Sequence, residues 1–335
     1  MPFVSLYWIL LGVVDVLAIL FNLFLIYLAL CKTPKMVRVY TTLIINLAVT
    51  DCCSAFLNFF VQQRMIPAGF TIGYVSNGLC RHFGYRVCYL SHNLMAHFIV
   101  HSNYSLLLSF AYRYYILRKP EPRRKTVLAV LVVTYLPSFV QMASFSFSFH
   151  HPVSLQILYQ MAESDPSEII SLLAPYYPEY DFTGLTVSGV ADIRNVFALF
   201  KILQMTVLTV PVFSTILVLR RKIIDRLIFR GINISLSTKS LHSQLLMALT
   251  YQALLPTLYS ISVVMYILEH SGLYSSPAME NYIMSGLVLI PFFSPFTSFF
   301  FFTPYKRFIL GLVLSKYTKR PSMASESGPA SIPIS

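Results

Sequence analysis

The stretch SFAYRYYILRKP, residues Ser109 to Pro120, marks the point where a long apolar run gives way to a basic segment. The apolar run before it covers about residues 88–111. Arg113 stands between two tyrosines, and Pro120 follows it by seven residues. A membrane helix needs about 20 mainly apolar residues, and Lys and Arg gather in cytoplasmic loops. The stretch therefore predicts the cytoplasmic end of a membrane-spanning helix.

Composition places the rest of the chain in a membrane as well. The 335 residues are 56% hydrophobic and only 11% charged, and the mean hydropathy is +0.66. A soluble domain carries about 25% charged residues, so this chain has too few charges to cover a water-facing surface. The net charge is +12, but it is divided into short blocks between apolar runs. That distribution is typical of membrane loops and speaks against a nucleic-acid partner.

Seven apolar stretches are long enough to cross a bilayer, at about 6–30, 41–62, 88–111, 127–149, 196–219, 242–268 and 282–303. They are continuous rather than alternating, which excludes a membrane β-barrel. We expect an all-α membrane protein, a seven-transmembrane helix bundle over residues 1–315. A Ser- and Pro-rich segment, 316–335, is expected to be a disordered cytoplasmic tail.

Orientation follows from the basic residues. Of the 25 Lys and Arg, 20 fall in the connections that follow the first, third and fifth spans or in the C-terminal segment. The N-terminus is therefore predicted outside and the C-terminus in the cytoplasm, in a multi-pass protein surrounded by membrane lipids. Of the outer connections, 63–87 is predicted to be irregular because it contains Pro67, Gly69, Gly73 and Gly78. The connection 150–195 is long enough to form a lid or binding loop.

The third span carries most of the polar residues. His97 and His101 are spaced i, i+4, so they share a helix face, either as an internally satisfied pair or as ligand contacts. Lys201 either extends its ammonium toward the interface or meets an anionic ligand. No further ligands at matching spacing point to a metal site. Helix phase gives these candidates for a ligand pocket: Asn93, His97, His101, Lys201, Gln204 and Tyr259.

Several residues inside the spans predict a helix network. Asp51 is an ionisable group within the second span, which is either functional or a polar tie between helices. Prolines interrupt the last three spans, where each predicts a kink or hinge. The candidate network consists of Asn22, Asn46, Asp51, Pro211, Pro256, Ser294 and Pro295.

These residues resemble the rhodopsin-like G-protein-coupled receptors. NLAVTD ends at Asp51 as their second-span motif does, and the resemblance implies that Asn22 pairs with that carboxyl. Cys88 stands 25 residues before Arg113, as in that family. The motif implies that the inner end of span three couples to a G protein, through Tyr112, Arg113, Tyr114 and Pro120.

The departures from that pattern are specific. Tyr112 replaces the acid before the arginine, Leu254 replaces the span-six tryptophan, and Ser298 replaces the span-seven tyrosine. The long outer connection has no cysteine, so the usual bridge to Cys88 is missing; Cys80 either pairs with Cys88 or both are free.

The blocks KTPKMVRVYTTLIINLAVTD, SFAYRYYILRKPEP and STKSLHSQLLMALTYQALLP resemble the nematode serpentine receptor class delta over about residues 5–315. The resemblance implies a chemosensory receptor that detects a small external molecule and signals to a heterotrimeric G protein. It also implies the plasma or ciliary membrane of sensory neurons, and no cofactor.

The sequence also bears on three other classes of function: an enzyme, a transporter and a channel. The chain has no motif of a hydrolase, metalloprotease or nucleotide-binding enzyme, so an enzyme is not expected. A proton-coupled transporter of seven spans would use Asp51, His97 and His101 as a proton path. A ligand-gated channel of seven spans would need its N-terminus inside, which the distribution of basic residues opposes.

Overall fold

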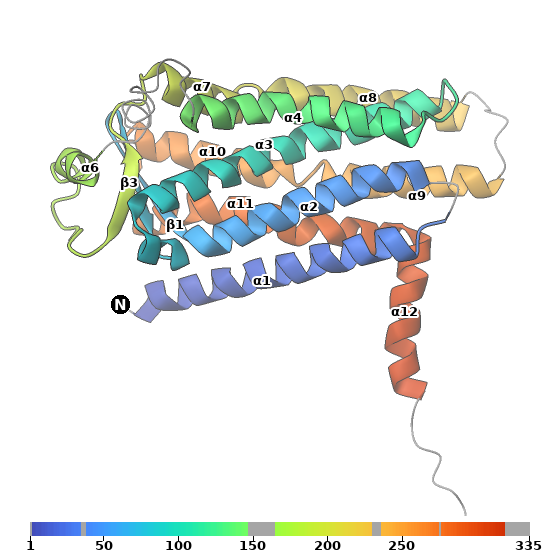
Figure 1. Ribbon diagram of the computed structural model, residues 1–335, viewed down its shortest axis with the longest axis horizontal. Helices are drawn as coiled ribbons and strands as arrows, with labels where there is room; N and C mark the ends of the chain where they lie inside the picture. Colours follow the sequence, from blue (N-terminus) through green and yellow to red (C-terminus); the bar gives the residue numbers. More distant parts are fainter. Residues whose placement is uncertain (1, 35–37, 147–164, 230–235, 275, 319–335) are drawn as a thin grey trace, which may run out of the picture.

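The computed structural model describes residues 2–34, 38–146, 165–229, 236–274 and 276–318. Long helices run side by side in a bundle, and a small sheet caps the end that holds the N-terminus (Figure 1). One helix, α12 (Thr303–Thr318), leaves the opposite end at a steep angle. The rest of the predicted tail lies outside the described residues.

The described helices form seven spans that cross the bundle. They are α1 (Pro2–Cys31), α2 (Arg38–Val61), α3 (Tyr85–Ile116), α4 (Arg124–Ser146), α7 (Val196–Thr206) with α8 (Thr209–Phe229), α9 (Leu236–Gln252) with α10 (Pro256–His270), and α11 (Pro277–Phe301). In the described residues, five segments are both long and apolar enough to cross a membrane: Leu6–Cys31, Arg38–Val61, Ala198–Arg226, Ser243–His270 and Pro277–Phe301. The helices α3 and α4 complete the seven.

The fifth and sixth spans are interrupted near the predicted prolines. Pro211 lies in the first turn of α8, just after the break that separates it from α7. Pro256 begins α10 after a short run of turns that ends α9. Proline lacks a backbone N–H and clashes with the preceding helical turn, so both breaks are expected. In α11 the helix continues through Pro291 and Pro295.

The bundle has lipid-facing apolar surface outside and mixed polar contacts inside. Leu30 in α1, Val132 in α4 and Val210 in α8 are each more than 60% exposed. Inside, one apolar cluster joins α1, α2, α3, α9 and α12 around Leu43, Phe110 and Tyr305. Because lipid is as apolar as these side chains, close van der Waals packing holds the helices together, rather than expulsion of water.

The outer cap contains regular structure that the sequence did not predict. The strands β1 (Gln63–Ala68), β2 (Thr71–Ser76) and β3 (Thr186–Val190) form an antiparallel sheet in the order β1-β2-β3. The 3-10 helix η2 (Leu79–Phe83) follows β2, and α6 (Pro166–Leu173) packs on the sheet. The prediction of an irregular connection over 63–87 was therefore wrong.

The residues that suggested irregularity have local roles in this sheet. Pro67 lies in β1, which is an edge strand where a missing N–H costs no ladder bond. Gly69 has a φ of 57° in the tight turn between β1 and β2, a conformation that favours glycine. A Cβ at Gly189 would lie 2.2 Å from the backbone oxygen of Ile72, so glycine lets β3 approach β2 closely.

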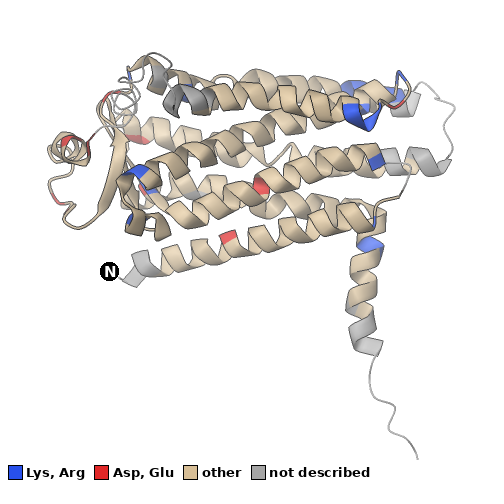
Figure 2. Ribbon diagram, viewed as in Figure 1, with Lys and Arg blue, Asp and Glu red and all other residues tan. Residues whose placement is uncertain are grey.

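Charge distribution agrees with the predicted orientation. Lys and Arg gather at the end of the bundle from which α12 leaves (Figure 2). The sheet and the N-terminus occupy the other end, which is accordingly the outer one.

Candidate functional site

A cavity of about 100 Å³ lies in the outer half of the bundle, below the sheet. It is lined by residues of α3, α7, α10 and α11, and by residues of β1 and β2 on the side of the sheet. Its described lining is mostly apolar: Met65, Ile72, Tyr74, His92, Met95, Ala96, Ile99, Lys201, Ile202, Met205, Thr206, Tyr259, Ser262, Val263, Tyr266, Ile283, Met284 and Leu287. Small-molecule sites in proteins are typically concave and apolar with a few placed polar groups.

Lys201 supplies the formal charge on this lining. Its side chain is only 8% exposed, and its Nζ donates a hydrogen bond to Asn93 Oδ1 at 2.7 Å. The lysine therefore points into the bundle rather than toward the membrane interface. The sequence left two alternatives for Lys201, extension to the membrane interface or contact with an anionic ligand. The structure does not have the first, because the ammonium bonds to Asn93 inside the bundle.

The other pocket candidates divide into two groups. Tyr259 lines the cavity and its hydroxyl donates to the Met205 carbonyl at 2.5 Å, which ties α10 to α7. Gln204 turns away and donates to the Pro137 carbonyl of α4 at 2.9 Å. Asn93 is not among the described lining residues, but its Oδ1 accepts the hydrogen bond from Lys201, which is.

His97 and His101 lie against α4 instead of the cavity. The His101 ring stacks on Tyr135 with centroids 3.5 Å apart, and its Nε2 lies 3.0 Å from the Ser105 hydroxyl. Asn46 in α2 donates to Ser105 at 2.8 Å and accepts from the Tyr135 hydroxyl at 3.3 Å. These contacts join α2, α3 and α4, as expected of a polar tie inside a membrane bundle.

Some cavity residues were missed by the sequence analysis. His92, Ala96 and Ile99 follow an i, i+4, i+7 pattern on the face of α3 that lines the cavity, so helix phase could have found them. Tyr74 and Met65 belong to the unpredicted sheet and carried no local signal.

The cap is fastened to the bundle by a charged cluster. Arg64 in β1 forms an ion pair with the buried Glu280 in α11. The Tyr180 hydroxyl donates to Glu280 Oε1 at 2.8 Å, and the Arg64 guanidinium lies over the Tyr180 ring at 4.5 Å. Burial and the adjacent Glu280 carboxyl raise the pKa of Tyr180, so this hydroxyl remains a donor.

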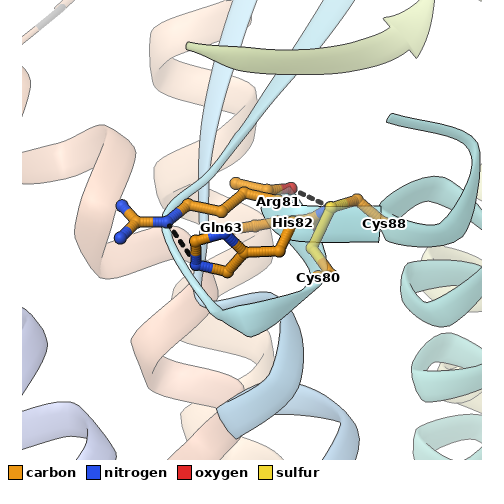
Figure 3. Close-up of a disulfide and its surroundings, with 6 residues drawn as sticks. Gln63, Cys80, Arg81, His82 and Cys88 are labelled. Carbon is orange, nitrogen blue, oxygen red and sulfur yellow. Dashed lines mark hydrogen bonds between the residues drawn. A yellow bond between two sulfur atoms is a disulfide. The ribbon is translucent and has the colours of Figure 1, made fainter. Parts of the chain in front are cut away.

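A disulfide makes a second attachment. Cys80 and Cys88 are bonded, with the sulfur atoms 1.98 Å apart, so η2 is tied to the first turn of α3 (Figure 3). Of the alternatives left open by the sequence, the structure has the bridged form.

In the middle of the bundle, Asp51 does not pair with Asn22 as the resemblance implied. The Ser102 hydroxyl of α3 donates to Asp51 Oδ1 at 3.0 Å, and Ser294 of α11 also interacts with this carboxyl. Asn22 donates instead to the Pro291 carbonyl at 2.9 Å. Pro295 lacks the N–H that would bond to the Pro291 carbonyl four residues earlier in α11, so this carbonyl is free to accept from the asparagine.

At the inner end of α3, Arg113 is buried with 3% exposure. Its guanidinium carbon lies 4.2 Å from the centre of the Tyr40 ring in α2, a cation–π contact. Tyr112, which replaces an acid, donates its hydroxyl to Glu121 at 2.8 Å. An acid is therefore present beside the motif, but it comes from the following loop and binds the tyrosine.

The two remaining candidates at this end border the cytoplasm. The Tyr114 ring contacts Arg118 at 4.6 Å and Arg226 of α8 at 5.5 Å, which links α3 to the fifth span. Pro120 is exposed in the connection between α3 and α4. The four candidate coupling residues thus share one end of the bundle, with two buried and two nearer the surface.

Comparison with known proteins agrees with this architecture. The fold is similar to squid rhodopsin, with a TM-score of 0.65 over 97% of this chain and 93% of that one, at 13% sequence identity. Serpentine receptor class delta-18 of Caenorhabditis elegans is 38% identical, over 86% of this chain and 84% of that protein. Serpentine receptor class delta-19 of the same organism is 36% identical, over 85% and 81%. Residues 6–311 match the family described as serpentine type 7TM GPCR chemoreceptor Srd, and the chain belongs to that family.

Proposed function

We propose that this chain detects a small external molecule in its outer cavity and signals to a heterotrimeric G protein through the inner end of α3. The observation that carries the proposal is that α3 contributes to both sites. His92 and Ile99 line the cavity, and Arg113 occupies the inner end of the same helix. Ile99 and Arg113 are separated by about 21 Å along the axis, at about 1.5 Å per residue.

The inner end of the bundle is closed over Arg113, and we propose that ligand binding shifts the receptor toward a form in which this end is open. Arg113 is buried against Tyr40, and Leu245 and Leu249 of α9 pack into the same apolar cluster as Tyr40 and Phe110. A G-protein α subunit can reach Arg113 only after α9 moves away from α3. A ligand that binds the open form more tightly would raise its population by its differential affinity for the two forms.

The interrupted spans offer the necessary freedom. The breaks before Pro256 and near Pro211 lie between the cavity and the inner end. Hinges are commonly a few residues at element ends that absorb the change in backbone angles. We place the receptor in the plasma or ciliary membrane of sensory neurons, as expected for its family.

The proposal is tested by comparing wild type with Arg113→Ala at matched surface expression. Recruitment of a panel of G-protein α subunits is recorded while small-molecule libraries are applied outside. Arg123→Ala serves as the control, because Arg123 is an exposed arginine in the connection that follows α3. We expect a response in wild type and the control that is lost in Arg113→Ala.

An equal response in all three receptors would refute the role of Arg113. A ligand-gated current that persists when G proteins are blocked would refute coupling and support a channel. Uptake of a tracer driven by a proton gradient, without G-protein recruitment, would support a transporter.

A further inference from the structure

The cavity has one polar end in an otherwise apolar wall. Among the described residues that line it, Lys201 is the only Lys, Arg, Asp or Glu. Methionine, isoleucine, leucine and valine side chains form most of the remaining wall. An ammonium carries three N–H donors and a positive charge, so an anionic acceptor on a ligand would be stabilised at the Lys201 end.

His92 adds a second polar group at that end. Its side chain is 4% exposed and lines the cavity, and its Nδ1 has no hydrogen-bond partner in the described part of the chain. The ring packs against Tyr74 with centroids 4.4 Å apart, which fixes its plane. Lys201 is close enough for its charge to act on the ring, and Asn93, which accepts from Lys201, is the next residue in α3.

Two buried acidic residues of the described outer end, Glu280 and Glu269, do not line the cavity. Glu280 is paired with Arg64 and Tyr180, and Glu269 is next to this pair rather than on the described lining. The described part of the lining therefore presents a cation and an imidazole nitrogen without a hydrogen-bond partner, and it contains no carboxylate. This combination fits a carboxylate, whose two oxygens can accept from both side chains in charge-assisted hydrogen bonds.

We propose that the cavity selects small monocarboxylic acids with a short apolar body, held by Lys201 and His92. This inference rests on the proposed function, because it names the ligand class of the same cavity. The volume of about 100 Å³ limits the apolar body. An engineered cavity of about 150 Å³ accommodates benzene, so the matching ligand is a short chain or a single ring.

Binding is measured directly, without any G protein, so that coupling and ligand class are separated. Full-length receptor is purified in detergent with lipid, and its melting temperature is followed in hexanoate, hexanol, hexanamide and hexylamine at equal concentrations. We expect hexanoate to stabilise the receptor and the three neutral or cationic analogues to have little effect. Palmitate tests a membrane fatty acid as the source of the carboxylate, and stronger stabilisation by palmitate would overturn the short-chain proposal.

Substitutions at Lys201 and His92 test whether these side chains hold the carboxylate of the bound hexanoate. Lys201→Met and His92→Phe are each expected to weaken hexanoate binding by about 10- to 100-fold, the loss of one hydrogen bond to a charged group. Lys306→Met is the matched control, because Lys306 is exposed on α12 at the other end of the bundle. If a variant does not fold, the comparison of acid with alcohol and amine in wild type still decides the ligand class.

The outcomes distinguish this inference from the proposed function. Stabilisation by hexylamine or hexanol equal to that by hexanoate would overturn the acid proposal. Unchanged hexanoate affinity in folded Lys201→Met and His92→Phe would also overturn it. Hexanoate binding without recruitment of any G protein would leave the ligand class standing and refute the proposed function.

Discussion

Replacing Tyr40 with leucine should raise basal signalling. The Arg113 guanidinium lies 4.2 Å from the Tyr40 ring, and both side chains are at least 95% buried. Leucine keeps apolar volume but removes the ring face that attracts the cation. Desolvated cation–π contacts contribute about 0.5–2 kcal/mol. If this contact exists only in the closed form, its loss multiplies the open population by about 2- to 30-fold.

The assay is ligand-free recruitment of a G-protein α subunit at matched surface expression. Tyr40→Phe keeps the ring but loses the hydrogen bond between Tyr40 and Arg113, so we expect a smaller rise than in Tyr40→Leu. Tyr115→Leu is the control, because Tyr115 is exposed at the same end and contacts Lys119 at 5.9 Å. Basal recruitment in Tyr40→Leu at or below the wild-type value, in a receptor that still responds to ligand, would refute the reasoning.

Three further predictions concern the outer cap. Cys88→Ser should lower the free energy of unfolding by about 2.5 kcal/mol, because the chain-entropy model gives this value for the short loop that the disulfide closes. Cys52→Ser is the control, and equal melting temperatures of the two variants would contradict the prediction. Glu280→Gln should destabilise the fold by about 1–3 kcal/mol, because the partly exposed Arg64 loses its charged partner. The added mutation Arg64→Met should recover part of this loss in thermal melts. Gly189→Ala should separate β3 from β2 and reduce surface expression, whereas normal expression and ligand binding would show that the sheet tolerates a Cβ there.

Much of the bundle could be predicted because a bilayer imposes strict rules. Hydrocarbon leaves only helices and closed barrels as spanning structures, so apolar length alone located the spans. Positive charge set their direction, and proline set the breaks near 211 and 256. The sheet obeyed no such rule. Its strands are short, and β3 pairs with β2 across more than 100 residues of sequence, which no local pattern announces.

The candidate site was only partly predictable for a related reason. Lys201 and Tyr259 could be nominated because a polar or aromatic side chain within an apolar run needs an internal partner. The direction of His97 and His101 depended on where α4 packs, and Tyr135 takes that face. Asn22 donates to the Pro291 carbonyl, which Pro295 leaves without a helical N–H donor in α11. Such choices between partners are made by tertiary packing, not by the residue type.

The most direct test of the account is whether a ligand in the outer cavity opens the inner end. Ala248 in α9 is 5% exposed and borders a small inner cavity beside Tyr40. Ala248→Cys is made in a receptor whose free cysteines Cys31, Cys52 and Cys53 are replaced by alanine, and it is labelled from the cytoplasmic side with a membrane-impermeant thiol reagent. We predict slow labelling without ligand and a clear acceleration with a ligand that recruits the G protein. An unchanged labelling rate while the G protein is recruited would contradict the coupling of the outer cavity to the inner end.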